Sequence, residues 1–374
     1  MKVLHFGTLD MNAGGPANSA YLTLLGLRDI GVDAQLAMYS LNKQGVLRGD
    51  KIPVHFMGKP INGRFAFSPL LKRKLLSLGE YDIFHAQGIW QYPTYALIDI
   101  AKKAGKPYVV TPRGMLYPQD IFKSNSFLKK VSLQMRLLKD LNNAACVHVT
   151  CNEERDHCRR LGVTSPIAVI PNPVEYVDFP VMSNRKHFIL GYLGRLSKRK
   201  RIEFLIYAFA DLAFPDAELV IVGGGDVDYE RFLKAEVNRL KLHNVSFLGF
   251  LSGEAKEKVL ANMSVLALPS EFENFGNVIV EALAHGIPCI ATHGAPWKDL
   301  EDYHCGWWVP NNRDAIKDAI ANAWSLHLSV LEEMGNRGKQ LVLKKYSMNA
   351  VAQSMKSVYN WILHDGECPE FLYK

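Results

Sequence analysis

The chain has 374 residues, of which 48% are hydrophobic, and this is enough material for two domains of ordinary size with buried cores. No stretch reaches the roughly 18 uninterrupted apolar residues of a membrane-spanning helix, and the first residues lack the layout of a signal peptide. The six cysteines show no disulfide-framework spacing. These features exclude a secreted or membrane-spanning protein, and we expect a cytoplasmic one.

The net charge of +7 is concentrated in the first half of the chain. Residues 1–180 contain 22 Lys and Arg against 14 Asp and Glu, whereas the rest contains 22 against 23. Such an asymmetry can indicate a nucleic acid, an anionic membrane surface or a phosphorylated substrate as the partner. The charge alone does not choose among these three.

Short apolar runs alternate with amphipathic stretches throughout the first half. We expect strands at 3–7, 34–38, 83–86, 108–111, 145–150 and 167–170, and helices at 19–30, 92–104 and 152–161. This βαβ rhythm predicts a parallel sheet. Pro171 and Pro173 then interrupt the pattern, and a linker is expected at about 174–186.

A second series of the same kind follows the linker. We expect strands at 188–193, 219–222, 245–248, 265–268 and 288–291, with helices at 201–212, 229–240, 254–262 and 277–285. Three more helices are expected from residue 312, the last with Val351, Met355, Val358, Tyr359 and Ile362 at helical spacing. The sequence therefore predicts an α/β protein with two doubly wound Rossmann-like domains, at 1–180 and 187–345. The C-terminal helix at 346–374 either stays with the second domain or crosses back to the first.

The most informative stretch joins the strand expected at 265–268 to its helix. Ligands of open parallel sheets bind at the carboxyl ends of the strands, where a glycine-containing turn into a helix offers N–H groups to an anion. The backbone at 275–277 (Phe275, Gly276 and Asn277) is therefore a candidate to contact a phosphate or a sugar hydroxyl. Glu273 lies in the turn and Glu281 about two helical turns further on, so the second carboxylate can reach a more distant diol. For an isolated pair of this kind, a capped helix with surface acids is the alternative.

Two motifs of the second half resemble those of a known family. Glu273 and Glu281 resemble the Glu-x7-Glu signature of glycosyltransferase family four, a large family of retaining enzymes with the GT-B fold. Upstream, the stretch that begins at Gly194 and contains Arg195 and Lys200 resembles the family's Gly-Arg-Leu-x-x-x-Lys element. The resemblance spans nearly the whole chain, and it implies two Rossmann-like domains facing a central cleft with a nucleotide diphosphate sugar as the donor.

The resemblance also implies roles for individual residues. Arg195 and Lys200 would hold the donor diphosphate, where two fixed cations can neutralise a leaving group, although a solvated basic loop would look similar. Glu281 would bind the ribose and Glu273 the sugar. The donor-binding set then consists of Gly14, Gly15, Arg195, Lys200, Glu273, Asn274, Phe275, Gly276, Asn277 and Glu281, in which Gly14 and Gly15 match the family's glycine-rich loop. Glycine pairs also occur in ordinary turns.

The first half departs from the family at one position. Where many members end a strand with His-x-His, this chain has His85-Ala86-Gln87. Gln87 can bind a sugar hydroxyl but cannot gain a proton, so we place it with Arg113 among the acceptor-binding candidates. His85 joins Glu273, Arg195 and Lys200 as a catalytic candidate. The alternatives are a packed strand-end histidine and a structural arginine.

Several other patterns suggest different chemistry. Asp226 and Asp228 have the Asp-x-Asp form of metal-dependent glycosyltransferases, but the preceding glycines match a loop of a fold that normally dispenses with metal, so we expect no metal and no cofactor. Cys146, His148, Cys151, His157 and Cys158 do not present the convergent ligands of a zinc site. No Gly-x-Gly-x-x-Gly supports a dehydrogenase.

The resemblance as a whole implies a retaining, metal-independent glycosyltransferase acting on a glycan or a lipid-linked acceptor. The stretches at 111–116 and 306–308 resemble the branch that assembles bacterial surface polysaccharide. Basic, aromatic segments at 64–76 and 127–139 fit either an anionic membrane surface or ordinary amphipathic helices. A nucleotide-sugar epimerase and a non-catalytic nucleotide-sugar-binding protein are the alternatives, and no nucleic-acid partner is expected.

Overall fold

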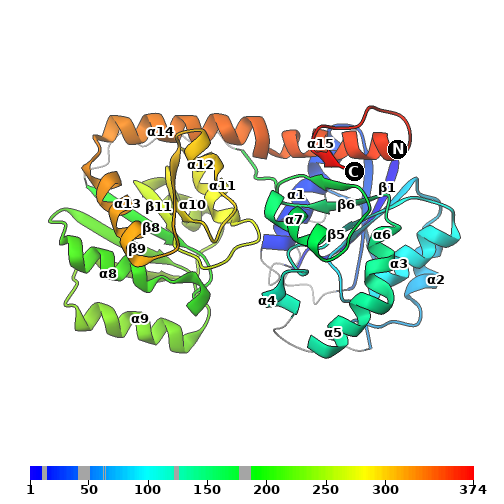
Figure 1. The fold of residues 1–374 in the computed structure, drawn as a ribbon, viewed down its shortest axis with the longest axis horizontal. Coiled ribbons are helices and arrows are strands. Elements are labelled where there is room, and N and C mark those ends of the chain that lie inside the picture. Colours follow the sequence, from blue (N-terminus) through cyan, green and yellow to red (C-terminus); the bar gives the residue numbers. More distant parts are fainter. Residues whose placement is uncertain (11–14, 41–50, 62, 64, 122–125, 177–186) are drawn as a thin grey trace. The chain divides into compact units, whose positions relative to one another are not determined.

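The computed structural model describes residues 1–10, 15–40, 51–61, 63, 65–121, 126–176 and 187–374. The chain divides into two compact units, residues 1–175 with 347–374, and residues 176–346 (Figure 1). Most of the linker expected at 174–186 lies outside the described residues. Within the described ranges, no helix is both long and apolar enough to cross a membrane.

The first unit is built on a sheet with the strand order β14-β7-β6-β5-β4-β1-β2-β3. Its strands are β1 (Lys2–Phe6), β2 (Asp33–Met38), β3 (Val54–Phe56), β4 (Ile83–Gln87), β5 (Tyr108–Thr111), β6 (Cys146–Val149), β7 (Ile167–Val169) and β14 (Leu372–Tyr373). Every neighbouring pair is parallel except β14 with β7, which is antiparallel. The predicted parallel sheet is thereby confirmed, while β3 and β14, three and two residues long, were not predicted.

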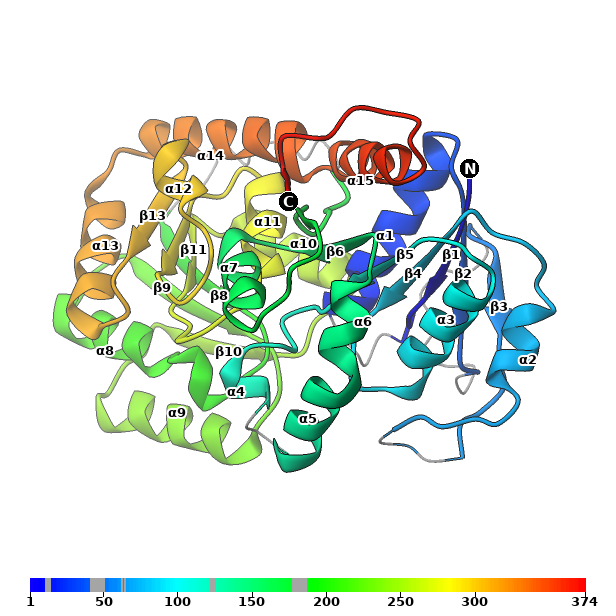
Figure 2. The same ribbon diagram turned by 45° about the vertical axis from the view of Figure 1, so that its right-hand side comes forward.

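Helices cover both faces of this sheet (Figures 1 and 2). They are α1 (Gly15–Asp29), α2 (Leu71–Leu76), α3 (Tyr92–Lys103), α4 (Pro118–Ile121), α5 (Ser126–Ser132), η2 (Leu133–Leu137), α6 (Leu138–Asn142), α7 (Asn152–Arg160) and α15 (Met348–Ile362). The helix expected from residue 19 begins four residues earlier, because Pro16 is compatible with the first turn of a helix. The C-terminal helix α15 belongs to this unit, where it packs on α1.

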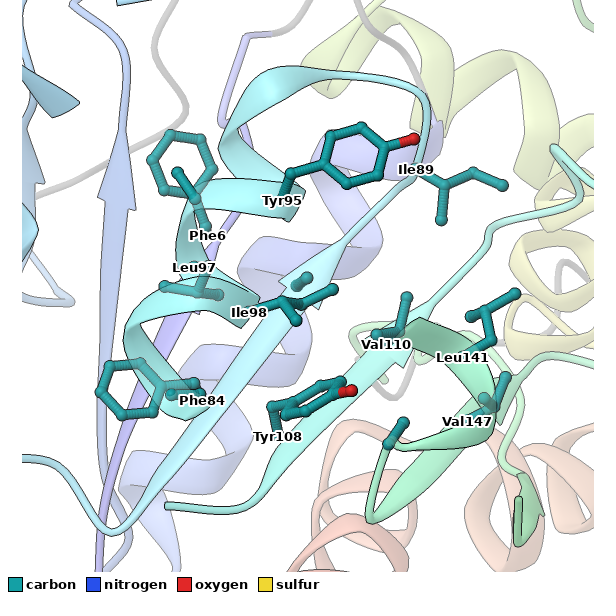
Figure 3. Packing of buried hydrophobic residues seen from close by; sticks show 14 of the residues in the cluster. Phe6, Phe84, Ile89, Tyr95, Leu97, Ile98, Tyr108, Val110, Leu141 and Val147 are labelled. Carbon is teal, nitrogen blue, oxygen red and sulfur yellow. The ribbon is translucent and has the colours of Figure 1, made fainter. Parts of the chain in front are cut away.

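The two faces of the sheet are filled by alternate residues of the same strands. Leu4 and Phe84 point into the core on the α3 side, shown in Figure 3, whereas Val3 and Ile83 point into the core beneath α1 and α15. Successive side chains of a strand point to opposite faces, so a strand buried on both sides reads as a continuous apolar run. This explains why the strand runs were recognisable in the sequence.

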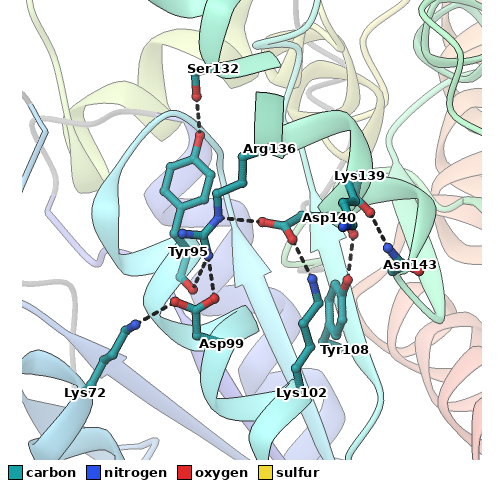
Figure 4. A network of polar contacts seen from close by, with 10 residues as sticks. All are labelled: Lys72, Tyr95, Asp99, Lys102, Tyr108, Ser132, Arg136, Lys139, Asp140 and Asn143. Carbon is teal, nitrogen blue, oxygen red and sulfur yellow. Dashed lines mark hydrogen bonds and ion pairs between the residues drawn. The ribbon is translucent and has the colours of Figure 1, made fainter. Parts of the chain in front are cut away.

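A polar network on the α3 side ties the helices together (Figure 4). Asp140, whose side chain is 5% exposed, lies 2.6 Å from the Lys102 ammonium and 3.0 Å from Arg136 Nε. Arg136 also pairs with Asp99, which Lys72 of α2 approaches to 2.6 Å. Because the buried Asp140 needs its partners, this network fixes α3 against η2 and α6.

The second unit contains a parallel sheet in the order β10-β9-β8-β11-β12-β13. Its elements are β8 (Phe188–Leu193), η3 (Lys198–Lys200), α8 (Glu203–Leu212), β9 (Ala217–Val222), α9 (Val227–Arg239), β10 (Val245–Gly249), α10 (Gly253–Asn262), β11 (Val265–Leu268), α11 (Asn277–Ala284), β12 (Cys289–Thr292), α12 (Asp299–Asp302), β13 (Gly306–Val309), α13 (Arg313–Ser325), α14 (Leu328–Leu341) and η4 (Val342–Tyr346). The predicted second doubly wound sheet is confirmed. Only β13 was not anticipated as a strand.

Candidate functional site

The ends of β8 and β9 approach each other closely in the second unit. Gly194 and Leu196 donate their N–H groups to backbone carbonyls at the end of β9, over 3.0 and 3.1 Å. A Cβ on Gly223 would lie 1.8 Å from the Gly194 carbonyl oxygen, so glycine is required for this approach. These contacts fix the backbone of Arg195, whose side chain is exposed and makes no ion pair with any part of the chain that the structure describes.

Lys200, at the end of η3, meets Glu273 from the turn after β11. Their side chains form an ion pair, and both are largely buried, with 15% and 12% of their surfaces exposed. Ser270 Oγ also donates to Glu273 Oε1 over 2.7 Å. The sequence motifs are 73 residues apart, and the structure brings their charged residues together at neighbouring strand ends.

Backbone hydrogen bonds hold the Glu273 turn in place. The Glu273 N–H donates to the Gly294 carbonyl over 2.7 Å, and the Glu271 N–H donates to the Arg199 carbonyl over 2.8 Å. A Cβ on Gly294 would lie 2.4 Å from the Ser270 carbonyl oxygen, which explains the glycine at that position. The carboxylate of Glu273 is thus carried by a turn with a fixed backbone.

The turn enters α11 through Gly276. This glycine has a φ of +82°, in the left-handed region that favours glycine. The Phe275 side chain is buried against Trp297 and Tyr346, and its carbonyl accepts the Trp297 indole N–H. Phe275 therefore serves the core through its side chain. Its N–H and that of Gly276 donate to no backbone carbonyl of the described residues, so the predicted backbone contact with a ligand stays available. Asn277 is the first residue of α11.

Glu281 lies on α11, where it meets a lysine of α10. Lys256 Nζ is 3.2 Å from the Glu281 carboxylate and 3.3 Å from that of Glu257. Burial lowers the pKa of Lys256, but the two carboxylates outweigh burial and raise it above its ordinary value. Sequence reasoning missed Lys256, because nothing in its local pattern links α10 to α11.

In the first unit, Arg113 binds Gln87 at the ends of β5 and β4. Arg113 Nε and one terminal nitrogen donate to Gln87 Oε1 over 3.1 and 2.7 Å, and the other terminal nitrogen donates to Ser19 and Asn172 over 2.6 and 3.1 Å. All these direct partners are neutral. Burial lowers the pKa of Arg113 to about 10, and the carboxylate of Glu154 opposes this shift. The two acceptor-binding candidates thus form one rigid pair.

His85 is completely buried in the first unit. Its Nδ1 lies 2.7 Å from the Tyr359 hydroxyl and its Nε2 lies 2.6 Å from Thr111 Oγ1. Burial holds the pKa of His85 well below its ordinary value. The catalytic role expected for His85 does not fit a ring with both nitrogens bonded and no exposed surface, and the position matches the alternative of a packed strand-end histidine.

The remaining candidates occupy structural positions or lie outside the described residues. Gly14 is among the latter, whereas Gly15 is the first residue of α1. Asp226 caps α9 by accepting the N–H groups of Asp228 and Tyr229 over 3.0 and 3.1 Å. Within the described ranges, no three His, Cys, Asp or Glu side chains converge as metal ligands do.

Taken together, each unit is a doubly wound parallel sheet with its polar candidates at the carboxyl ends of the strands, where such sheets bind ligands. The GT-B fold consists of two units of this kind. The Anabaena protein HepE, solved in complex with UDP and with UDP-glucose, is similar in structure. With UDP, its TM-score is 0.77 at 21% identity, over 95% of this chain and 98% of HepE.

Family comparison specifies the class further. The model "Glycosyl transferases group 1" matches residues 178–341, and the model "Glycosyl transferase 4-like domain" matches residues 14–173. The chain belongs to the glycosyltransferases that these models describe, the family-four type with the GT-B fold.

Two curated relatives cover different shares of the chain. A glycosyltransferase of Methanocaldococcus jannaschii is 34% identical over 175 residues, which is 45% of this chain and 43% of the relative. The phosphatidyl-myo-inositol mannosyltransferase of Mycobacterium tuberculosis is 25% identical over 334 residues, which is 85% of this chain and 84% of the relative.

Proposed function

We propose that this protein is a retaining glycosyltransferase that moves a sugar from a nucleotide diphosphate to a glycan or lipid-linked acceptor. The observation that carries the proposal is the meeting of Lys200 and Glu273 at neighbouring strand ends, with Arg195 on the same loop as Lys200. Arg195 and Lys200 bind the diphosphate, Glu281 binds the ribose, and Glu273 with the N–H groups at 275–277 binds the sugar.

Positive charge supplies the chemistry in this proposal. The bond between the sugar and the diphosphate oxygen breaks, and the acceptor oxygen bonds to the same face of the sugar. The departing phosphate oxygen takes the acceptor's proton, so no protein nucleophile is needed. Arg195 and Lys200 stabilise the charge that develops on the diphosphate, which is the task that a metal ion performs in metal-dependent transferases.

The Lys200–Glu273 pair gives the site a defined response to its donor. Without a ligand, Glu273 neutralises Lys200, so the ammonium is held in place at little electrostatic cost. A diphosphate carries more negative charge than the carboxylate and attracts the ammonium, which frees Glu273 Oε1 for the sugar hydroxyls. The same two side chains therefore preorganise the site, and when the donor binds, Lys200 contacts the diphosphate and Glu273 contacts the sugar.

The acceptor belongs to the first unit, where Gln87 and Arg113 form their rigid pair. The resemblance at 111–116 and 306–308 supports an acceptor from bacterial surface polysaccharide. The name of the mycobacterial relative, which acts on phosphatidyl-myo-inositol, adds support for a lipid-linked acceptor. The HepE complexes make UDP-glucose the first donor to test.

A lipid-linked acceptor fits an apolar and basic surface on α5 and η2. Phe127, Leu128 and Met135 are 75%, 65% and 78% exposed, and Lys129 and Lys130 lie between them. Apolar side chains beside lysines suit the headgroup region of an anionic membrane. The proposal includes peripheral contact there. Flotation with phosphatidylglycerol vesicles should recover the wild type but little of a Phe127→Ser, Met135→Ser variant, and equal recovery of both would exclude this surface.

The decisive experiment is a thermal-shift and product screen against nucleotide diphosphate sugars with a chelator present. Glu281→Ala and Lys200→Ala are compared with the wild type, and Glu254→Ala and Lys258→Ala serve as controls because they remove an exposed pair on α10. A donor that stabilises and is turned over by the wild type and the controls alone supports the site. A changed sugar on an intact donor would indicate an epimerase, and binding without turnover a non-catalytic binder. An equal response in Glu281→Ala or Lys200→Ala would reject the assigned residues.

A further inference from the structure

Three histidines on β1, β4 and β6 of the first unit are joined in one line of hydrogen bonds, which passes through Thr111 on the intervening β5. His5 on β1 pairs in register with His85 on β4, and His148 follows on β6. All three rings are buried, as are the hydroxyl groups of Thr111 and Tyr359 that connect them. None of these residues has a place in the proposed donor site.

The first part of the line runs from the acceptor candidates to the C-terminal helix. Arg113 donates to Gln87 Oε1 over 2.7 Å, and Gln87 Nε2 lies 3.2 Å from His5 Nδ1. His5 Nε2 lies 3.2 Å from the hydroxyl of Tyr359 on α15. A residue 272 positions away in the sequence from Gln87 is thus only two hydrogen bonds from its amide.

The second part runs from Tyr359 into the sheet. The hydroxyl lies 2.7 Å from His85 Nδ1, and His85 Nε2 lies 2.6 Å from Thr111 Oγ1. Thr111 Oγ1 lies 3.0 Å from His148 Nδ1, and His148 Nε2 lies 2.9 Å from the Ile170 carbonyl oxygen. The line therefore ends on the backbone just after β7.

The two ends fix the direction of every bond. A guanidinium only donates and a carbonyl only accepts, while a neutral imidazole has one donor and one acceptor. Starting from Ile170, His148 carries its proton on Nε2, Thr111 donates to His148, and His85 carries its proton on Nε2. Tyr359 then donates to His85, and His5 carries its proton on Nε2. A proton added to His5 would set its Nδ1–H against the N–H of Gln87, and one added to His85 or His148 would deprive the buried hydroxyl of Tyr359 or Thr111 of its acceptor.

The same rule settles the orientation of the Gln87 amide. Its Oε1 faces two donors of Arg113, and its Nε2 faces the unprotonated Nδ1 of His5. Both Oε1 lone pairs are occupied and one N–H is used, so Gln87 offers a ligand one N–H donor and no acceptor. A partly exposed glutamine could otherwise offer both.

We infer that Tyr359 is a positioning residue for the acceptor side of the site. Its hydroxyl accepts the His5 Nε2 proton, which leaves His5 Nδ1 as the acceptor that anchors the Gln87 amide nitrogen while Arg113 holds the amide oxygen. The inference rests on the proposed function for its consequence in catalysis, but the orientation itself is a property of the free protein. The C-terminal helix α15, which packs on α1, thus helps to orient the Gln87 side chain at the end of β4.

The test compares Tyr359→Phe with two other variants of the full chain. Ser357→Ala, the control, removes a hydroxyl of α15 that bonds only to the backbone of its own helix. Thr111→Val breaks the line on the far side of His85 and leaves the Tyr359–His5–Gln87 part intact. If Tyr359→Phe folds poorly, the wild type still decides, because a His5 proton on Nδ1 would overturn the inference. Nitrogen NMR of histidine rings and glutamine amides reads the line directly.

We expect the wild type to show all three rings neutral with the proton on Nε2. Tyr359→Phe should move the His5 and Gln87 signals, Thr111→Val should move those of His85 and His148 but not Gln87, and Ser357→Ala should move none. Unchanged His5 and Gln87 signals in Tyr359→Phe, or equal Gln87 shifts in Tyr359→Phe and Thr111→Val, would overturn the inference.

Kinetics measure the consequence separately. Tyr359→Phe should raise KM for the acceptor about three- to tenfold, corresponding to about 1 kcal/mol, and leave KM for the donor within about twofold. Parallel losses for donor and acceptor would show a merely structural role and overturn the positioning assignment. No transfer by the wild type would refute the proposed function, and the NMR result would still decide the orientation.

Discussion

Lys256 on α10 lies 3.2 Å from Glu281 on α11, so the carboxylate assigned to the ribose is already held by a cation from another helix. An ionised carboxylate has about four lone-pair sites, and one ammonium contact leaves enough of them for a diol. Glu257 lies 3.3 Å from the same ammonium and holds it from the other side. Lys256 therefore orients Glu281 without competing for its function.

The first prediction concerns this lysine. Lys256→Met should weaken donor binding about tenfold, because Glu281 loses the contact that fixes its rotamer, and the loss corresponds to about 1.4 kcal/mol. The value of kcat should change little, since the lysine touches no reacting atom. Titration of the donor by calorimetry and the KM for the donor both measure the effect. Lys258→Met is the control, because Lys258 lies on the same helix in an exposed pair with Glu254. An equal weakening in the control would rule out the positioning role.

The close approach of β8 and β9 gives a second prediction. Gly223→Ala should lower the free energy of unfolding by about 2–5 kcal/mol, because its Cβ would meet the Gly194 carbonyl and its φ is +145°. The backbone that carries Arg195 would shift, so donor binding should fall as well. Chemical denaturation and donor titration provide the measurements.

Gly249→Ala is the matched control for this change. Gly249 also has a positive φ, of +70°, but a Cβ there would meet no atom within 4 Å. It should cost about 1 kcal/mol through backbone conformation alone. If both variants lost the same stability, the close approach at Gly223 would not be the cause.

Local patterns explain why much of the fold was predictable. The runs at 108–111, 188–193 and 265–268 are strands with the predicted bounds, because both faces of these parallel sheets are covered and the strands are mainly apolar. By contrast, β13 was missed although Gly306 is required there, since a Cβ would lie 2.1 Å from the Cys289 carbonyl. That requirement arises from a neighbouring strand and leaves no local signal.

The site residues likewise differ in whether a local sequence pattern indicates them. Lys200 and Glu273 were recognised because each belongs to a local motif, and their contact follows from strand order. His5 and Tyr359 were not, because the two hydrogen bonds that connect them to Gln87 join residues 82 and 354 positions apart. His85 was placed in the catalytic set because of the family's His-x-His pattern, and only the fold shows that its ring is enclosed, with both nitrogens bonded to Tyr359 and Thr111.

A third prediction concerns Gln87 itself. Gln87→Met keeps the length of the side chain but removes the acceptor for Arg113 and the donor to His5. Because buried groups are left without partners, the free energy of unfolding should fall by about 1–3 kcal/mol. The KM for the acceptor should rise, while donor binding should stay the same. Gln91→Met is the control, since Gln91 is exposed and its side chain does not cap α3. A rise in the donor KM alone would contradict the assignment of Gln87 to the acceptor.

The last prediction follows from the neutral histidines. Burial lowers the pKa of His5 to about 3 and that of His148 to about 4, from an ordinary value of 6.5. Between each lowered pKa and 6.5, the unfolded chain binds more protons than the folded one, so the free energy of unfolding rises with pH. The contribution of each buried neutral ring to the free energy of unfolding is complete above about pH 6.5. It decreases as the pH falls toward 4, by up to about 1.4 kcal/mol per pH unit.

Replacing one ring isolates its share of this dependence. Folding of wild type, His148→Gln and His243→Gln is measured by urea denaturation from pH 4.5 to 7.5. Glu154, whose buried carboxyl has a raised pKa, contributes with the opposite sign, but it is common to all three proteins and cancels in the differences.

The difference in stability between wild type and His148→Gln should shrink as the pH falls below 6, because only the wild type must keep that buried ring neutral. His243 is exposed and serves as the control for replacing a histidine at the surface. A constant difference between wild type and His148→Gln across this range would mean that the folded protein accepts the proton on His148, and the fixed direction of the hydrogen-bond line would then be wrong.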